Sequence, residues 1–214
     1  MSDTIVRLIR HAAHGQLGHI LTGRMPGIGL SKEGEAQARA LGRRMARLPI
    51  TAVRVSPQQR TRETAAIAFP QLADRLAEDS DLAEIDFGAW SGQSFAELED
   101  DPAWRHWNEA RGEASTPAGE TMSGVAARMQ GAIARLRDGR ERQVALVSHC
   151  DTIKAVVCRT LGLPFSQLHR FDIAPASVTT LVVGDWGAKL LALNEVSEAQ
   201  DHEHPRMGDD GDMA

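Results

Sequence analysis

Apolar residues along the chain follow two patterns: short continuous runs, and longer segments in which they recur every three or four positions. The runs TIVRLIRH (residues 4–11), TAVRVSP (51–57) and QVALVSHC (143–150) are rich in β-branched residues, which is typical of buried strands. We expect the first strand to end near Arg10. Two further strand-like runs flank GDWG within residues 177–194, which is typical of a β-hairpin.

The periodic segments predict helices between these strands. Residues 30–49 have Ser31 as N-cap, acidic residues in the first turn and Pro49 at the end. A second helix is expected with Ser56 as its N-cap and Pro57 at its first position. The remaining predicted helices cover residues 119–139 and 151–164.

Residues 81–118 are less regular and contain three of the four tryptophans, Trp90, Trp104 and Trp107, among acidic residues and Gly or Pro breaks. We expect this segment to form a short excursion over the sheet that contains helices. Its tryptophans fit two interpretations. They line a lid over an organic substrate, or they pack the excursion onto the sheet.

The alternation of strands and helices predicts an α/β protein, a three-layer α/β/α sandwich with a mostly parallel central sheet and an antiparallel edge. A chain of 214 residues is long enough for one good-sized domain, which we place at residues 1–196. Residues 197–214 are polar, acidic and without periodicity, so we expect this tail to be disordered.

Composition and charge exclude several classes of function. A hydrophobic content of 42% and a charged content of 25% are those of an ordinary globular protein. A net charge of −5 with no basic block does not indicate a nucleic-acid or membrane surface. We find no signal peptide and no apolar run near the ~20 residues of a membrane span. Cys150 and Cys158 are too close in sequence for a useful disulfide within a helix, which favours a reduced, cytoplasmic setting.

Chemistry-bearing residues follow three of the predicted strands. Arg10 and His11 end the first strand, the segment up to Arg60 follows the second, and His149 follows a later one. Ligands of open α/β sheets bind at the carboxyl ends of the strands, so these side chains are expected to converge there. Two guanidinium groups favour a phosphate clamp, and a histidine beside such a clamp can attack phosphorus. The helix that starts at Cys150 would add backbone N–H donors and its positive dipole end to the anion.

Five segments in this order resemble the histidine phosphatase superfamily, which has the phosphoglycerate mutase-like fold. They are LIRH, SPQQRTRETA, LAEIDFGAWSG, GET and LVSHCDTIKAVV, and they span nearly all of the chain except the tail. Each segment alone is a weak signal, and the five together are a strong one.

The resemblance implies a role for each matching residue. His11 would be the nucleophile that forms a phosphohistidine, and Arg10, Arg60 and His149 would hold the phosphoryl oxygens. Glu84 stands where many members of the family have the proton donor to the leaving oxygen. A carboxylic acid can act there near neutral pH only if its pKa is raised, which apolar neighbours would do. Asp86 is a nearby substitute for this role.

The chain also departs from the family pattern around the nucleophile. The usual Arg-His-Gly is followed by Glu or Gln and then by Ser or Thr, whereas this chain has Ala12, Ala13 and His14. Ala12 is a modest change if its φ is negative and a strained one otherwise. Leu17 stands where mutases have Asn.

Other positions of the substrate set are retained or changed mildly. The turn Thr22, Gly23 and Arg24 resembles the substrate-contact turn of the family, so we expect these residues to bind substrate. Cys150 replaces the usual Gly, where mainly a backbone N–H is needed. Glu120 fits either the GET motif or the ordinary position of an acid at a helix N-terminus.

Three other interpretations stay open. A zinc or iron site built from His11, His14, His19 and Asp151 is possible by ligand type, although two arginines at the same edge would repel a cation. His14 and His19 otherwise read as bystanders or substrate-side contacts. A helix N-terminus could also make Cys150 a reactive thiol.

We interpret the chain as a phosphomonoesterase that acts on a small phosphorylated metabolite without a metal or other cofactor. The alternatives are a phosphoglycerate mutase-type phosphoryl transfer, and a catalytically weak phosphate-binding module. Hydrolysis is favoured over mutase activity because the segment between Trp90 and Gly119 is short for the lid that a mutase needs. The sequence carries no signal for the oligomeric state or for a particular phosphoester.

Overall fold

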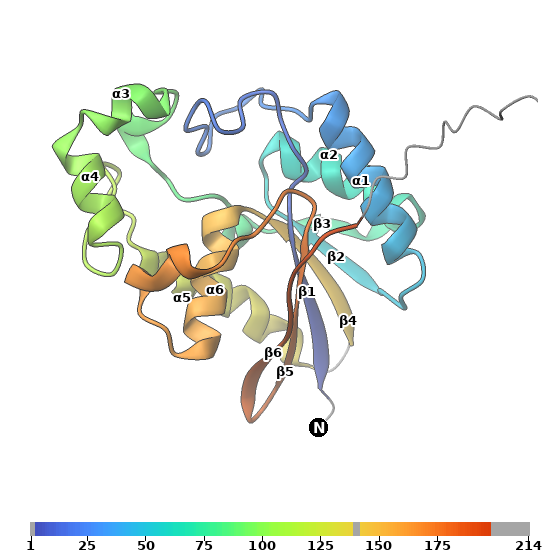
Figure 1. Cartoon of the computed structure of the whole chain (residues 1–214). Coiled ribbons are helices and arrows are strands. Elements are labelled where there is room, and N and C mark those ends of the chain that lie inside the picture. The colour runs from blue at the N-terminus through green and yellow to red at the C-terminus, as the bar shows by residue number, and fades with distance from the viewer. Residues whose placement is uncertain (1–2, 139–141, 198–214) are drawn as a thin grey trace, which may run out of the picture.

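The computed structural model describes residues 3–138 and 142–197, and a six-stranded sheet runs through its centre (Figure 1). The strand order is β3-β2-β4-β1-β5-β6. The first four strands run parallel, and β5 and β6 pair antiparallel at one edge. The strands are β1 (Thr4–Arg10), β2 (Ala52–Val55), β3 (Leu76–Glu78), β4 (Gln143–Ser148), β5 (Val178–Gly184) and β6 (Gly187–Glu195).

Two pairs of helices cover the two faces of this sheet (Figure 1). One face packs against α5 (Met122–Ala134) and α6 (Cys150–Leu161). The other packs against α1 (Lys32–Met45) and α2 (Gln59–Ala68). The predicted three-layer α/β/α sandwich with an antiparallel edge is therefore confirmed.

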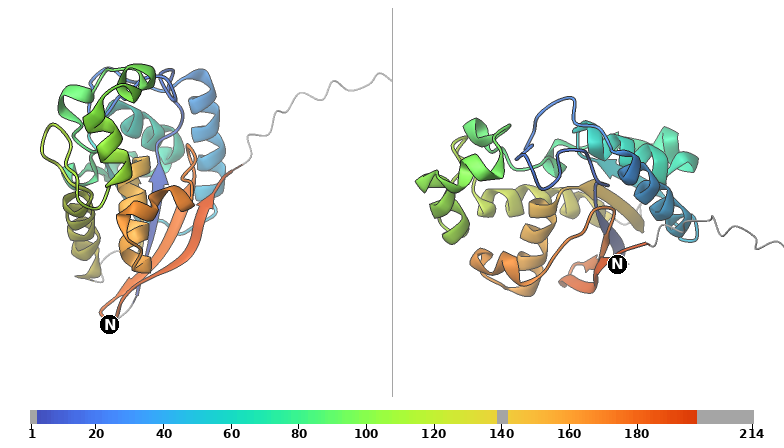
Figure 2. Two further views of the ribbon diagram at one scale, coloured as in Figure 1. Left: turned by 60° about the vertical axis from the view of Figure 1, so that its left-hand side comes forward. Right: turned by 45° about the horizontal axis from the view of Figure 1, so that its top comes forward.

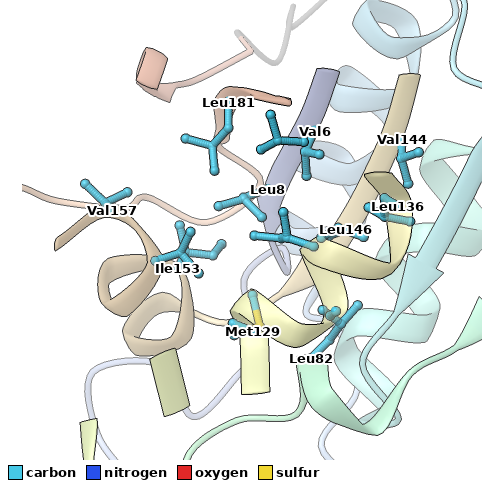
Figure 3. Close-up of a cluster of buried hydrophobic side chains, with 14 of the residues drawn as sticks. Val6, Leu8, Leu82, Met129, Leu136, Val144, Leu146, Ile153, Val157 and Leu181 are labelled. Carbon is cyan, nitrogen blue, oxygen red and sulfur yellow. The ribbon is translucent and has the colours of Figure 1, made fainter. Parts of the chain in front are cut away.

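The two layers of core follow from alternation along the strands. Val6 and Leu8 of β1 face α5 and α6, where they pack with residues such as Met129 (Figure 3). Ile9 of β1 faces the opposite layer, with Leu41 of α1. Each of these side chains is 0% exposed, and burying one stabilises the fold by about 1.5–3 kcal/mol. Continuous apolar runs are what a sheet buried on both faces requires.

The excursion forms a third apolar cluster beside α5 and α6 and contains α3 (Phe95–Glu99) and α4 (Pro102–Glu109). Trp90 and Trp104 pack edge to face with their ring centroids 5.3 Å apart. Trp107 is fully buried in the same cluster. Short 3-10 helices complete the fold at Pro70–Arg75, Ser80–Leu82, Gly88–Trp90, Arg135–Asp138 and Phe165–Arg170.

Three local predictions differ from the structure. Ser56 is not an N-cap, because α2 begins at Gln59 and the Ser56 hydroxyl is bonded to His149 instead. Helix α1 ends at Met45, before the predicted stop at Pro49. The short edge strand β3 was not predicted, because its three residues are too few to show an alternation of apolar and polar positions.

The predicted β-hairpin is confirmed. Asp185 and Trp186 form the turn between β5 and β6. Residues 198–214 of the predicted disordered tail lie outside the described residues.

Both cysteines are free thiols. Within residues 3–138 and 142–197, no helix has the length and apolar composition needed to cross a membrane.

Candidate active site

The five predicted catalytic residues lie together at the carboxyl ends of β1, β2 and β4. Arg10, His11, Arg60 and Glu84 line one cavity of about 330 Å³. His149 lies directly behind them, with its ring centroid 5.2 Å from that of His11. The segment after β1 arches over this edge, beside α3 and α4 (Figure 2).

His11 has one ring nitrogen available for chemistry. Its Nδ1 lies 2.8 Å from the carbonyl oxygen of Ala12, and a carbonyl can only accept, so Nδ1 carries the proton. Nε2 therefore keeps its lone pair. Burial first, and then the charges of Arg60 and Arg10, hold the pKa of His11 well below its usual value. The ring is neutral, and hence nucleophilic, near neutral pH.

The two predicted clamp arginines have buried donors without partners. Arg60 is 1% exposed and donates from Nη2 to the Gly23 carbonyl at 2.7 Å. Arg10 donates from Nη1 to the Ile173 carbonyl at 2.6 Å. In the described part of the chain, Nε and Nη1 of Arg60 and Nε of Arg10 are buried without a hydrogen-bond partner. A buried donor without a hydrogen-bond partner costs about 1–3 kcal/mol of stability, and more when it is charged. Such donors therefore suit an anionic ligand.

His149 is held by a polar network that the sequence analysis did not identify. Its Nδ1 accepts from Nη2 of Arg60 at 3.1 Å, so Nε2 carries the proton. Nε2 lies 2.7 Å from the Ser56 hydroxyl and 3.2 Å from Oε1 of Gln58. Burial first, and then Arg60, hold the pKa of His149 well below its usual value. The two polar residues Ser56 and Gln58, just after β2, were the signal for this network in the sequence. We interpreted that segment only as the start of a helix.

Glu84 has the environment of a neutral acid. Its Oε2 is 3.7 Å from Nδ1 of His149, and its Oε1 accepts from the Ile85 N–H at 2.9 Å. The pKa of Glu84 is raised to about 7, mainly by burial and secondly by the nearby charge of Asp151. The carboxyl group is therefore substantially protonated at neutral pH and can donate a proton.

Three charged residues hold the Glu84 loop in place. Glu120 accepts from the Asp86 N–H at 2.6 Å and pairs with Arg128 at 2.9 Å and Arg24 at 3.0 Å. Arg24 and Arg128 also donate to the Glu84 carbonyl, at 2.7 and 3.3 Å. Glu120 therefore stabilises the Glu84 loop through these contacts, in addition to lying near a helix N-terminus.

The structure divides the predicted substrate-binding residues. Thr22, Gly23 and Cys150 line the cavity, whereas Arg24 is not among its lining residues. Cys150 begins α6, whose first N–H groups have no partner within the helix. Burial first, and then Asp151, raise the pKa of the Cys150 thiol to about 11, so the thiol stays protonated and is a poor candidate nucleophile.

The replacement of glycine by Ala12 causes no backbone strain. In the described residues, the non-glycine positions with positive φ are Ala176 and Asn194, so Ala12 has a negative φ. Its N–H donates to the Thr64 hydroxyl at 3.0 Å, and its side chain is fully buried.

The other unusual histidines differ in environment. His14 lines the cavity, with its ring centroid 5.4 Å from that of His11. Burial first, and then Arg60, lower the pKa of His14 to about 4, so it is neutral at pH values well above this. His19 is exposed and lies outside the cavity lining. Among the described residues, no group of three or more His, Cys, Asp or Glu is arranged to hold a metal ion.

One wall of the cavity is apolar. The loop after β1 and the excursion supply Leu17, Ile20, Leu21, Phe87, Phe95 and Trp104 to its lining. The three tryptophans differ in position. Trp104 faces the cavity, while Trp90 and Trp107 lie outside its lining and pack within the excursion.

Comparison with known proteins assigns the family. Residues 6–196 match the family model of the histidine phosphatase superfamily (branch 1). The chain therefore belongs to the histidine phosphatase superfamily, as the resemblance of its five motifs implied.

The relatives and neighbours of the chain agree with this assignment. The chain is 31% identical to phosphoserine phosphatase 1 of Hydrogenobacter thermophilus over 77% of its own length and 80% of the relative. It is 30% identical to an acid phosphatase of Mycobacterium tuberculosis, over 77% and 81% of the two chains. The structure of Bacillus stearothermophilus YhfR superposes with a TM-score of 0.84 at 24% identity, covering 92% and 100%. That last likeness shows the fold alone.

Proposed function

We propose that this protein is a phosphomonoesterase that hydrolyses small phosphorylated compounds through a phosphohistidine on His11. The observation that carries the proposal is the cluster of unpartnered guanidinium donors of Arg10 and Arg60 around a neutral histidine. A phosphate dianion supplies acceptors for these donors and neutralises both charges. The phosphatase names of the relatives support the same class of reaction.

In the first step, Nε2 of His11 attacks phosphorus and the P–O bond to the alcohol breaks. Glu84 gives its proton to the leaving oxygen, so the product is a neutral alcohol and the carboxyl becomes a carboxylate. Arg10 and Arg60 stabilise the negative charge on the equatorial oxygens of the phosphoryl group. A loose transition state needs this stabilisation most at these oxygens. His149, held by Ser56, borders the same space.

In the second step, water attacks phosphorus from the side that the alcohol has left. Glu84, now a carboxylate, takes the proton from this water, and the P–N bond to His11 breaks. Inorganic phosphate leaves and both residues return to their starting states. The cycle balances with protein groups and water alone, so we expect it to need no cofactor.

Hydrolysis remains favoured over mutase activity by the shape of the excursion. Between Trp90 and Gly119 it contains α3 and α4, helices of five and eight residues. A mutase must exclude water from the phosphoenzyme and reorient its intermediate. We expect an excursion of this size to leave the phosphoenzyme accessible to water.

The test is mass spectrometry of the protein after a rapid, acid-free quench with an aryl phosphate. Wild-type protein and the His14→Ala variant are expected to gain the mass of one phosphoryl group and to release phosphate, while His11→Ala gains none. Transfer of the phosphoryl group from His11 to an added alcohol or phosphoglycerate, instead of to water, would indicate a mutase. The absence of both adduct and turnover would indicate a phosphate-binding module.

A further inference from the structure

The charged groups around the cavity fall into two sets with opposite properties. At the inner end, Arg10 and Arg60 have donors without partners. The other charged pair of the described lining is Arg111 with Asp151, joined at 2.9 Å. These two side chains are 17% and 23% exposed, so the ion pair is largely shielded from water.

The Arg111 guanidinium is occupied on three sides. Nη1 donates to Asp151, and Nη2 donates to Oδ1 of Asn108 at 2.8 Å. Its central carbon lies 5.0 Å from the centroid of the Trp107 ring, a cation–π contact. A substrate carboxylate that bound the remaining N–H groups of Arg111 would therefore lie beside the Asp151 carboxylate, which already neutralises this guanidinium.

The rest of the outer cavity offers no replacement cation within the described residues. Arg24 lies outside the lining and is paired with Asp86 and Glu120. His14 is neutral at physiological pH because burial and Arg60 lower its pKa to about 4. The six apolar side chains of the wall cannot solvate a charge.

From this arrangement we infer that the cavity selects phosphomonoesters with an apolar, uncharged leaving group, and that Asp151 excludes esters with a second anionic group. The inference rests on the proposed phosphatase function and names its substrate class, the phosphate esters of aryl and other apolar alcohols. Asp151 acts as a specificity-determining residue, because its carboxylate both neutralises the charge of Arg111 and repels a second anion.

The inference is tested with three esters that differ at one position: phenyl phosphate, 3-carboxyphenyl phosphate and 3-carbamoylphenyl phosphate. Wild-type protein is expected to favour the phenyl and carbamoyl esters over the carboxylate by roughly tenfold or more in kcat/KM. The carbamoyl ester has the size of the carboxylate without its charge. It therefore separates repulsion from lack of space.

Two variants are expected to move this preference in opposite directions. Asp151→Asn frees Arg111, so the ratio of carboxylate to carbamoyl ester should rise by roughly tenfold. Arg111→Leu leaves Asp151 without its partner, so the same ratio should fall. A ratio within one enzyme cancels any general loss of rate, including one caused by a changed Glu84. Glu78→Gln, which removes an equally negative but half-exposed side chain on β3, should leave the ratio at its wild-type value.

The outcomes separate the inference from the function on which it rests. Wild-type protein that prefers the carboxylate, or an Asp151→Asn ratio equal to that of wild type, would overturn the inference while the phosphatase function stands. Failure to hydrolyse any of the three esters would instead count against the function itself. An opposite shift in Arg111→Leu keeps the test decisive if Asp151→Asn folds poorly.

Discussion

The inner and outer parts of the cavity use arginine in different ways. Arg60, at the inner end, is 1% exposed and has two buried nitrogen atoms without partners. Arg111, which also lines the cavity, and Arg24, which lies outside its lining, are each paired with carboxylates and bonded to further acceptors. We therefore expect an anionic ligand at the buried cation whose donors are unpaired, whereas cations that are already paired with carboxylates hold the structure.

A second contrast concerns the elements that present these groups. The inner residues follow strands of the sheet or begin helices packed on it, where hydrogen bonds such as that from the His11 N–H to the Ser148 carbonyl at 2.9 Å set the backbone. The outer wall comes from the loop after β1 and from the excursion. In the proposed mechanism, the reacting groups are therefore held on or beside the sheet, and the apolar wall comes from the segments above it.

The largest expected effect breaks the contrast between the arginines directly. Arg60→Met should lower kcat/KM for phenyl phosphate by roughly 10³-fold, because it removes a preorganised donor of the transition-state charge. Arg24→Met should lower it by no more than about tenfold, through a looser Glu84 loop, since an exposed ion pair contributes little. Steady-state kinetics on both variants checks this, with thermal unfolding to confirm that each is folded. Equal losses in the two variants would remove the distinction.

The next effect concerns the acid between the two parts. Glu84→Gln should lower kcat for an alkyl phosphate by roughly 10²-fold, and for 4-nitrophenyl phosphate by less, because nitrophenolate leaves without a proton. In wild-type protein the rate for the alkyl ester should fall as pH rises through the Glu84 pKa of about 7, since only the protonated carboxyl donates. This descending limb should be absent from the variant.

The control for Glu84 is the neighbouring carboxylate. Asp86 is half-exposed and paired with Arg24, so Asp86→Asn should keep both the rate and the pH limb. Loss of the limb in Asp86→Asn, with retention in Glu84→Gln, would assign the proton to Asp86.

The smallest expected effect sharpens the description of the outer wall. Trp104→Ala removes an apolar surface of the cavity, so KM for phenyl phosphate should rise by about five- to tenfold while kcat changes little. Trp186→Ala is the matched control, because that ring is 59% exposed on the turn between β5 and β6. An unchanged KM in Trp104→Ala would show that the substrate does not reach the wall.

Most of the fold and the inner site could be predicted from the chain alone. Buried strands of a parallel sheet are continuous apolar runs, and their carboxyl ends must meet at one edge, so Arg10, His11 and His149 were predicted to be neighbours. Glu84 was placed only by resemblance to a family, because a carboxylate in a loop has no periodic signal.

Several features depended on contacts between distant segments, which local patterns do not encode. Ser56 looked like an N-cap, since a serine before a proline and a helix satisfies every local rule. The tertiary structure gives its hydroxyl to His149, which lies 93 residues away. In the same way, the pKa of Glu84 depends on how deeply the excursion buries it and on Asp151 beyond β4.

The sequence by itself determined the order of strands and helices apart from the edge strand β3, the residues at the strand ends and the family. It did so because periodicity and motif spacing are properties of neighbouring residues. Only the tertiary structure decided which charges are paired. The sequence analysis assigned Arg24 to the substrate and gave Arg111 no role, whereas the fold brings them their partners Glu120 and Asp151 from 96 and 40 residues away. Pairing depends on distance in space, and this distance decides where an anion can bind.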